Sequence, residues 1–148
     1  MVGIVVVAHG RLARELILIT EFIIGKVVGI EAVTTDPKMS ADEIKEEISR
    51  AIKKVNQGEG TLILTDMFGG TPSNISLSFL EEKKVEILSG VNLPMLLKVS
   101  TYQGSRSLSE MAEFIKSYGQ KSISLASEIL KGKKEKKAKR KNRKDGKD

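Results

Sequence analysis

The chain alternates short apolar segments rich in β-branched residues with longer segments whose apolar side chains recur every three or four residues. The first pattern is typical of buried strands and the second of amphipathic helices. The predicted strands are residues 2–8, 27–35, 61–65 and 85–88; helices are predicted over 11–24, from Ser40 to about 55 and from the turn at 66–74 to about 80, with further helical stretches after 90 and from Ser107. This alternation predicts an α/β fold, a doubly wound and mostly parallel sheet with right-handed crossovers.

We expect the strand order 2-1-3-4, which places the switch point of the sheet between the first and third strands. In open α/β sheets, ligands collect beside such a point, at the carboxyl ends of the strands. His9 and Asp66 directly follow the first and third predicted strands. The topology therefore predicts that these two side chains meet in one crevice.

Near the C-terminus, residues 121–125 read Lys-Ser-Ile-Ser-Leu and alternate polar and apolar side chains. This alternation is typical of a strand with one exposed face. We therefore expect an antiparallel strand at the edge of the sheet.

The sequence contains no internal repeat and no second domain.

The composition excludes several kinds of site. The 148 residues are enough for one domain with a core, and they include no cysteine, so disulfides, thiolate metal sites and cysteine nucleophiles are excluded. One histidine argues against a zinc or other transition-metal site. No apolar run reaches the length of a membrane span, and the N-terminus leads into a strand rather than a signal peptide. We therefore expect a cytoplasmic protein without a metal or cofactor.

The charge is concentrated at the C-terminus. Residues 131–148 contain eleven Lys and Arg against three acidic residues, a local charge of +8, whereas residues 1–130 contain 14 against 16, a charge of −2. With Ala138 as its only apolar side chain, this tail cannot bury enough surface to order itself, so we expect a domain at 1–130 followed by a disordered basic tail. Such a tail can bind nucleic acid or an anionic membrane by counterion release, although a solvated extension is the favoured interpretation. No aromatic residue is present there to stack on bases.

His9 is the only histidine of the chain, and Gly10 after it lets the backbone turn toward the next helix. A lone histidine is often structural, and an aspartate at a strand end is often a cap or turn residue. If Asp66 accepts a hydrogen bond from one ring nitrogen, the other nitrogen keeps a lone pair that points outward. The carboxylate then stabilises the charge that forms when this nitrogen attacks, as expected of a nucleophile with an orienting group.

The turn after Asp66 contains Gly69, Gly70 and Thr71. Backbone N–H groups at the start of a helix bind anions, glycines allow close approach, and a threonine hydroxyl adds a donor, so these residues could bind a phosphoryl group. The same residues also occur in ordinary tight turns and helix caps. Because neither a P-loop nor a Gly-x-Gly-x-x-Gly motif is present, the phosphoryl group is expected from another protein or a small phosphate ester.

Three segments resemble one known family. Gly-Ile-Val-Val-Val-Ala-His-Gly-Arg-Leu-Ala at 3–13, Leu-Thr-Asp-Met-Phe-Gly-Gly-Thr-Pro-Ser-Asn at 64–74 and Gly-Val-Asn-Leu-Pro-Met-Leu at 90–96 are similar to the IIA component of the mannose family of the bacterial phosphoenolpyruvate-dependent sugar phosphotransferase system. The segments have the family's order and spacing, and the resemblance covers about residues 1–125. It implies a phosphotransferase with a role in sugar uptake.

The resemblance also implies roles for residues and partners. His9 accepts phosphate on Nε2 from the carrier protein HPr and passes it to a histidine of a IIB component, while Asp66 holds the Nδ1 proton and Thr71 lies near the phosphoryl group. Family members form homodimers that exchange a terminal strand, which implies that role for residues 121–125, and membrane IIC and IID components are only indirect partners. Ala8 departs from the serine of many relatives, and the basic tail lies outside the family pattern.

Two alternatives share this chemistry. The protein can be a regulatory module in which the phosphorylation state of His9 selects a partner without sugar transport. It can also be the phosphotransfer subunit of a dihydroxyacetone kinase, although the segments at 69–72 and 91–94 fit the mannose-type component better. A third alternative is binding of nucleic acid or an anionic membrane through the tail.

Overall fold

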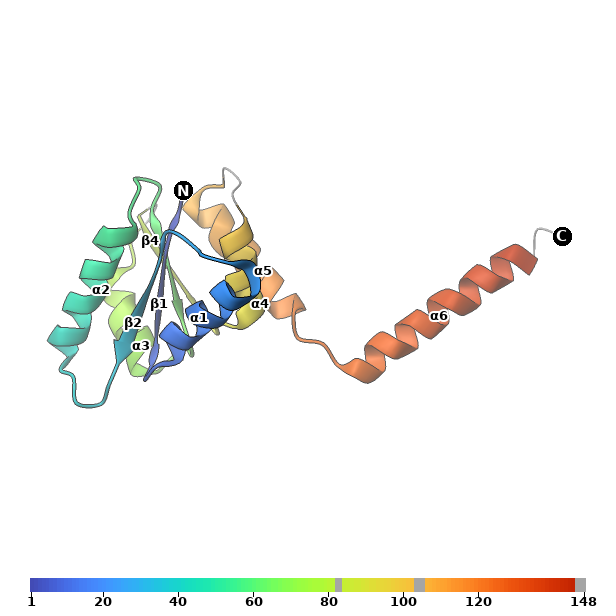
Figure 1. Cartoon of the computed structure of the whole chain (residues 1–148), viewed down its shortest axis with the longest axis horizontal. Helices are drawn as coiled ribbons and strands as arrows, with labels where there is room; N and C mark the ends of the chain where they lie inside the picture. The colour runs from blue at the N-terminus through green and yellow to red at the C-terminus, as the bar shows by residue number, and fades with distance from the viewer. Residues whose placement is uncertain (82–83, 103–105, 146–148) are drawn as a thin grey trace.

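The computed structural model of the chain describes residues 1–81, 84–102 and 106–145. A sheet of four parallel strands lies between two layers of helices, and one long helix projects away from this domain (Figure 1). The strands are β1 (Gly3–His9), β2 (Ile30–Thr35), β3 (Thr61–Thr65) and β4 (Val85–Ser89). Their order is β2-β1-β3-β4, so the predicted fold class, parallel sheet and strand order are confirmed.

Two groups of helices cover the two faces of the sheet (Figure 1). The helices are α1 (Leu12–Ile24), α2 (Ala41–Val55), α3 (Thr71–Ser76), the short 3₁₀ helix η1 (Leu77–Phe79), α4 (Leu93–Thr101), α5 (Leu108–Lys121) and α6 (Ala126–Asp145). One face of the sheet packs against α1, α4 and α5, and the other packs against α2 and α3. This arrangement leaves the carboxyl ends of the strands free to carry a site.

The two central strands are buried on both faces because their side chains alternate between two cores. From β1, Ile4 and Val6 enter the core with α4 and α5, whereas Val5 and Val7 enter the core with α2. Every residue of β3 is buried. Burial of apolar surface stabilises the fold by roughly 25 cal/mol per Å², so these two strands are its most firmly held part.

The helix caps follow the sequence closely. The Ser40 side chain accepts a hydrogen bond from the Glu43 N–H at the start of α2, and Ser107 forms a full capping box with Glu110 at the start of α5.

The second strand is shorter than predicted: it begins at Ile30, after Gly29 in the left-handed region at φ +74°. The helix predicted up to about residue 80 divides into α3 and η1.

The predicted edge strand at 121–125 is absent from the single chain, so this expectation is wrong for one isolated copy. Helix α5 continues through Lys121, and residues 122–125 connect it to α6. The Ser122 N–H and hydroxyl both donate to the Gly119 carbonyl, which ends α5 locally. A strand needs a neighbouring edge for its backbone hydrogen bonds, and this segment leads away from the sheet. Strand exchange between two copies stays a prediction.

The basic tail also differs from the expectation of disorder, because α6 is helical up to Asp145. The physical reason is local: Lys, Arg, Glu and Ala have high helix propensity, and a helix satisfies its backbone hydrogen bonds without tertiary contacts. Burial against the domain does not contribute to this helix, since α6 does not pack on the domain (Figure 1). Among the described residues, no helix is both long and apolar enough to cross a membrane.

Candidate functional site

His9 is the last residue of β1 and lies at the carboxyl edge of the sheet. Its side chain is 52% exposed, whereas the six preceding residues of the strand are buried. Gly10 follows in the left-handed region at φ +56°, which turns the chain toward α1. The histidine is therefore anchored by a buried strand and has its ring at the surface.

Two hydrogen bonds from the neighbouring strand hold the backbone on both sides of His9. The Gly10 N–H donates to the Thr35 carbonyl at 2.8 Å, and the Thr35 hydroxyl donates to the Ala8 carbonyl at 3.0 Å. Thr35 is buried at the end of β2. Sequence patterns alone did not single out Thr35, although its place at the end of the strand next to the first one is a usable signal.

Asp66 follows β3 and contacts His9 directly, which confirms the expected proximity of the two side chains. Its Oδ2 atom lies 2.7 Å from Nδ1 of His9 and accepts a hydrogen bond from the His9 N–H at 3.0 Å. Its Oδ1 atom accepts from the Met67 N–H at 2.9 Å. The carboxylate is 12% exposed, so it is largely buried beneath the exposed ring.

The electrostatics of Asp66 keep it ionised. Burial raises its pKa, but hydrogen bonds from the His9 backbone and ring, the attraction of the His9 ring when that ring is protonated, and the hydrogen bond from the Met67 N–H outweigh this effect and leave the pKa below its ordinary value. Because an ionised carboxylate only accepts hydrogen bonds, Nδ1 of His9 is the donor of the pair. The lone pair of the neutral ring then resides on Nε2, which is the nitrogen available for attack.

The predicted glycine-rich turn lies against the ring. A Cβ atom placed on Gly70 would lie 2.9 Å from Cε1 and 3.5 Å from Nε2 of His9, so the Gly70 backbone approaches the edge of the ring that carries Nε2. Gly69 has φ +88°, a conformation that other residues rarely adopt. The turn therefore requires glycine for two reasons: the backbone conformation at Gly69 and the close approach at Gly70.

Thr71 begins α3, and its side chain is exposed. Among the described residues, its hydroxyl has no hydrogen-bond partner, so this donor is available to a ligand. The first N–H groups of a helix also lack intrahelical partners. A role of Gly69, Gly70 and Thr71 in phosphate binding stays a prediction.

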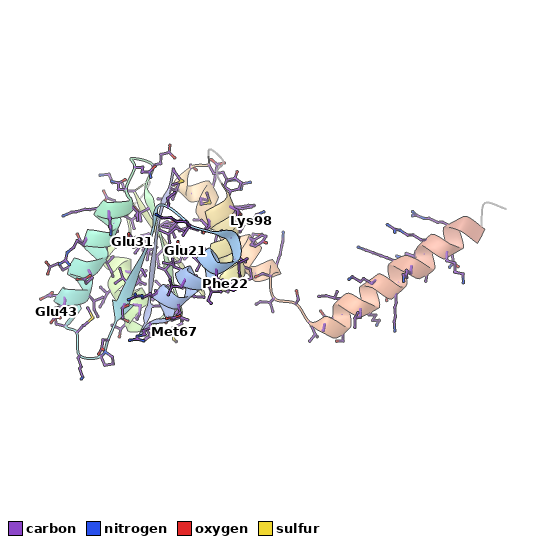
Figure 2. The ribbon with its side chains drawn as sticks, in the orientation of Figure 1. Glu21, Phe22, Glu31, Glu43, Met67 and Lys98 are labelled. Carbon is purple, nitrogen blue, oxygen red and sulfur yellow. The ribbon has the colours of Figure 1, made fainter. Side chains whose placement is uncertain are left out.

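Two apolar side chains are exposed beside the pair. Met67 and Phe68, which directly follow Asp66, are both exposed. Figure 2 shows Met67 at the edge of the domain where α1 begins. Exposed apolar side chains beside a reactive group favour contact with another protein.

Among the described residues, the His9–Asp66 pair belongs to no metal cluster, and a large cavity lies at the other edge of the sheet. Within the described ranges, no group of three or more His, Cys, Asp or Glu residues could hold a metal ion. A cavity of about 1050 Å³ lies near the amino ends of β3 and β4, where Gly58, Val85 and Leu108 contribute to its lining. Neither His9 nor Asp66 lines this cavity, and the pair lies at the opposite, carboxyl edge of the sheet, where the His9 side chain is half exposed.

The fold and this pair define a class: an α/β protein with an exposed histidine, oriented by a carboxylate, at the switch point of a parallel sheet. Residues 3–116 match the model of the EIIA-man family, described as the fructose IIA component of the sugar phosphotransferase system. The chain belongs to this family. Membership implies a transferase role, phosphotransfer in sugar uptake.

Individual relatives agree with the family match. The fructose-specific EIIA component of Bacillus subtilis is 30% identical over 131 residues, which cover 88% of this chain and 90% of that protein. The sorbose-specific EIIA component of Lacticaseibacillus casei is 31% identical, covering 76% of this chain and 81% of that protein. The crystal structure of an EIIA component from Streptococcus agalactiae superposes with a TM-score of 0.74 at 25% identity, covering 86% of this chain and 98% of that one.

Proposed function

We propose that His9 carries the phosphoryl group, which it accepts from the phosphohistidine of HPr and passes to a histidine of a IIB component. One observation carries this proposal: Nδ1 of His9 lies 2.7 Å from the largely buried Asp66 carboxylate, while half of the side chain is exposed. Nε2 is then the reactive atom, on a half-exposed ring that a partner protein can reach from the solvent.

The transfer step follows from this geometry. The Nε2 lone pair attacks phosphorus while the bond between phosphorus and the donor's ring nitrogen breaks, and that electron pair stays with the donor's imidazole. The His9 ring becomes positively charged and keeps its Nδ1 proton, which remains hydrogen-bonded to Asp66. The carboxylate thus orients the ring before attack and stabilises its charge afterwards.

Gly69, Gly70 and Thr71 are proposed to bind the phosphoryl oxygens. The support is the close approach of the Gly70 backbone to Nε2 and the available hydroxyl of Thr71 at the start of α3. Phosphoryl transfer depends mostly on positioning and on stabilisation of the oxygens. Each well-placed donor contributes on the order of 3 kcal/mol to such stabilisation.

The test is phosphorylation in a reconstituted system. The protein is incubated with phosphoenolpyruvate, enzyme I and HPr, and intact-mass and peptide analysis then locate the phosphate. We expect one acid-labile, base-stable phosphoryl group on His9 and none on the His9→Gln variant. A circular dichroism spectrum of the variant controls for folding. Label on the folded variant would refute the proposal.

We also propose that two copies exchange residues 121–125. Within the described part of the chain, no strand pairs with the outer edge of β4, and Ile123 is 83% exposed on a segment that alternates polar and apolar residues. Multi-angle light scattering is expected to give the mass of a dimer. The Ile123→Asp variant should give a monomer, and a monomeric native protein would contradict the exchange.

A further inference from the structure

The long helix α6 is not used by the phosphotransfer site, although it contains ten of the 25 Lys and Arg residues and has a net charge of +7. Residues 131–148 carry a net +8, whereas residues 1–130 carry −2. The side chains of α6 extend into open space around the helix, away from every other element (Figure 2). A helix with this charge and no packing partner presents its whole circumference to a binding partner.

The charges are not equivalent around this helix. At 3.6 residues per turn, Lys133, Lys137 and Arg140 project within about 30° of the direction midway between Ile129 and Leu130. We call the side defined by these five residues the basic face. It combines an apolar first part with a cationic second part.

The acidic side chains of α6 lie elsewhere. At the same helical spacing, Glu128 and Glu135 project about 150° or more from the centre of the basic face. Lys131 and Lys139 also lie on this opposite side, at about 130–150°. The basic face is therefore free of negative charge, whereas the opposite side mixes both signs.

The apolar residues at the start of the basic face are exposed to solvent. Ile129 is 45% exposed and Leu130 is 60% exposed, and neither belongs to a core cluster of the domain. Exposed aliphatic side chains directly before a run of cations favour membrane binding in two ways. The apolar groups enter the boundary of the lipid layer, and the cations contact the anionic headgroups.

We infer that α6 binds an anionic lipid membrane through its basic face and holds the phosphotransfer domain at the membrane surface. Nucleic acid is a poorer match, because phosphates attract the cations but make no use of Ile129 and Leu130. The helix also lacks aromatic side chains, on which unpaired bases stack. The inference goes beyond the proposed phosphotransfer and does not depend on His9.

The affinity of α6 for the membrane depends on the number of cations near the lipid. Each Lys or Arg at an anionic surface changes membrane partitioning about fivefold, so loss of two cations from the basic face weakens binding by roughly 25-fold. Binding also falls as salt rises, because ions screen the exposed charges.

The experiment is co-sedimentation of the full chain with vesicles. Vesicles of phosphatidylcholine alone are compared with vesicles that contain phosphatidylglycerol. We expect binding to the anionic vesicles only, and release at high salt. No binding to the anionic vesicles would overturn the inference.

Two double variants with the same net charge test whether the basic face makes the contact with the membrane. Lys133→Gln with Lys137→Gln removes cations from the basic face, and Lys131→Gln with Lys139→Gln removes the same number from the opposite side. Gln and Lys have similar helix propensity, so the helix itself is preserved. The first pair should weaken vesicle binding roughly 25-fold and the second pair only a few-fold. Equal losses would contradict a face-specific contact.

A third comparison separates lipid from nucleic acid. Ile129→Ser with Leu130→Ser should reduce vesicle binding at least tenfold and leave binding to duplex or single-stranded oligonucleotides unchanged. Tighter binding to an oligonucleotide than to anionic vesicles at the same salt concentration would identify α6 as a nucleic-acid contact and refute the membrane role. Unchanged vesicle binding by this variant would refute it as well.

Discussion

Oδ2 of Asp66 accepts two hydrogen bonds from one residue, the backbone N–H of His9 at 3.0 Å and its ring Nδ1 at 2.7 Å. A single carboxylate oxygen thus holds both the main chain and the side chain of the histidine. Because β1 and β3 are adjacent and buried, the distance between the two residues is set by the sheet rather than by a flexible loop.

Replacement of Asp66 by Asn should slow phosphorylation of His9 by one to two orders of magnitude. The amide carries no charge to stabilise the ring after attack, and a hydrogen bond to a charged group contributes about 1.5–3 kcal/mol. Rapid-quench measurement of transfer from phosphorylated HPr gives the rate. The melting temperature controls for folding, and a folded variant with an unchanged rate would remove Asp66 from the mechanism.

The same carboxylate should make stability depend on acid pH. Its pKa in the folded protein lies below the ordinary value of 3.8, so it stabilises the fold fully above that value. As pH falls, the unfolded chain takes up the proton first, and the contribution is lost as pH passes through the lower folded pKa. Urea unfolding at a series of pH values should therefore show the native protein losing stability relative to Asp66→Asn below about pH 4. A constant difference down to pH 3 would contradict this coupling.

Gly70→Ala should impair transfer while leaving the fold intact. Gly70 has φ −81°, which alanine adopts without strain, but the added Cβ would lie 2.9 Å from Cε1 of His9 and displace the ring. We expect at least a tenfold loss of the phosphorylation rate, because transfer depends on accurate positioning.

The matched control is Gly69→Ala. Its φ of +88° makes alanine unfavourable by about 1 kcal/mol, although no atom lies within 4 Å of the added Cβ. This variant should lower the melting temperature and transfer faster than Gly70→Ala. The reverse order of rates would show that the contact with the ring is not what matters at Gly70.

Gly3→Ala should destabilise the domain. The added Cβ would lie 2.6 Å from both Cγ2 and the carbonyl oxygen of Val55, the last residue of α2, so the helix end must shift. Overpacking of this kind costs about 1–3 kcal/mol, which urea unfolding measures.

Gly132→Ala, a substitution within α6, is the comparison for Gly3→Ala. No atom lies within 4 Å of its added Cβ, and alanine favours a helix interior by about 1 kcal/mol. We expect more helical signal in circular dichroism and no change in the melting temperature of the domain. A matching loss of domain stability in the two glycine variants would show that α6 packs on the domain.

The sheet order and the His9–Asp66 pair were predictable because both depend on patterns along the chain. Buried strands of β-branched residues and intervening amphipathic helices restrict the topology to a parallel sheet, and the topology then brings the ends of β1 and β3 together. The two differences at the C-terminus have another origin. The sequence pattern at 121–125 favours a strand, but in the single chain this segment leads away from the sheet and does not pair with the outer edge of β4. The helix of the tail arises from local propensity, which acts without burial.

The amino-acid sequence by itself determined which segments become strands and helices, and which residues with reactive side chains end those strands. Only the tertiary structure decided which atoms meet: Oδ2 of Asp66 with the backbone N–H and the Nδ1 atom of His9, the Gly70 backbone with the ring, and the Thr35 hydroxyl with the Ala8 carbonyl. The physical reason is that periodicity reports the faces and ends of elements, whereas contacts of about 3 Å depend on how elements distant in sequence pack.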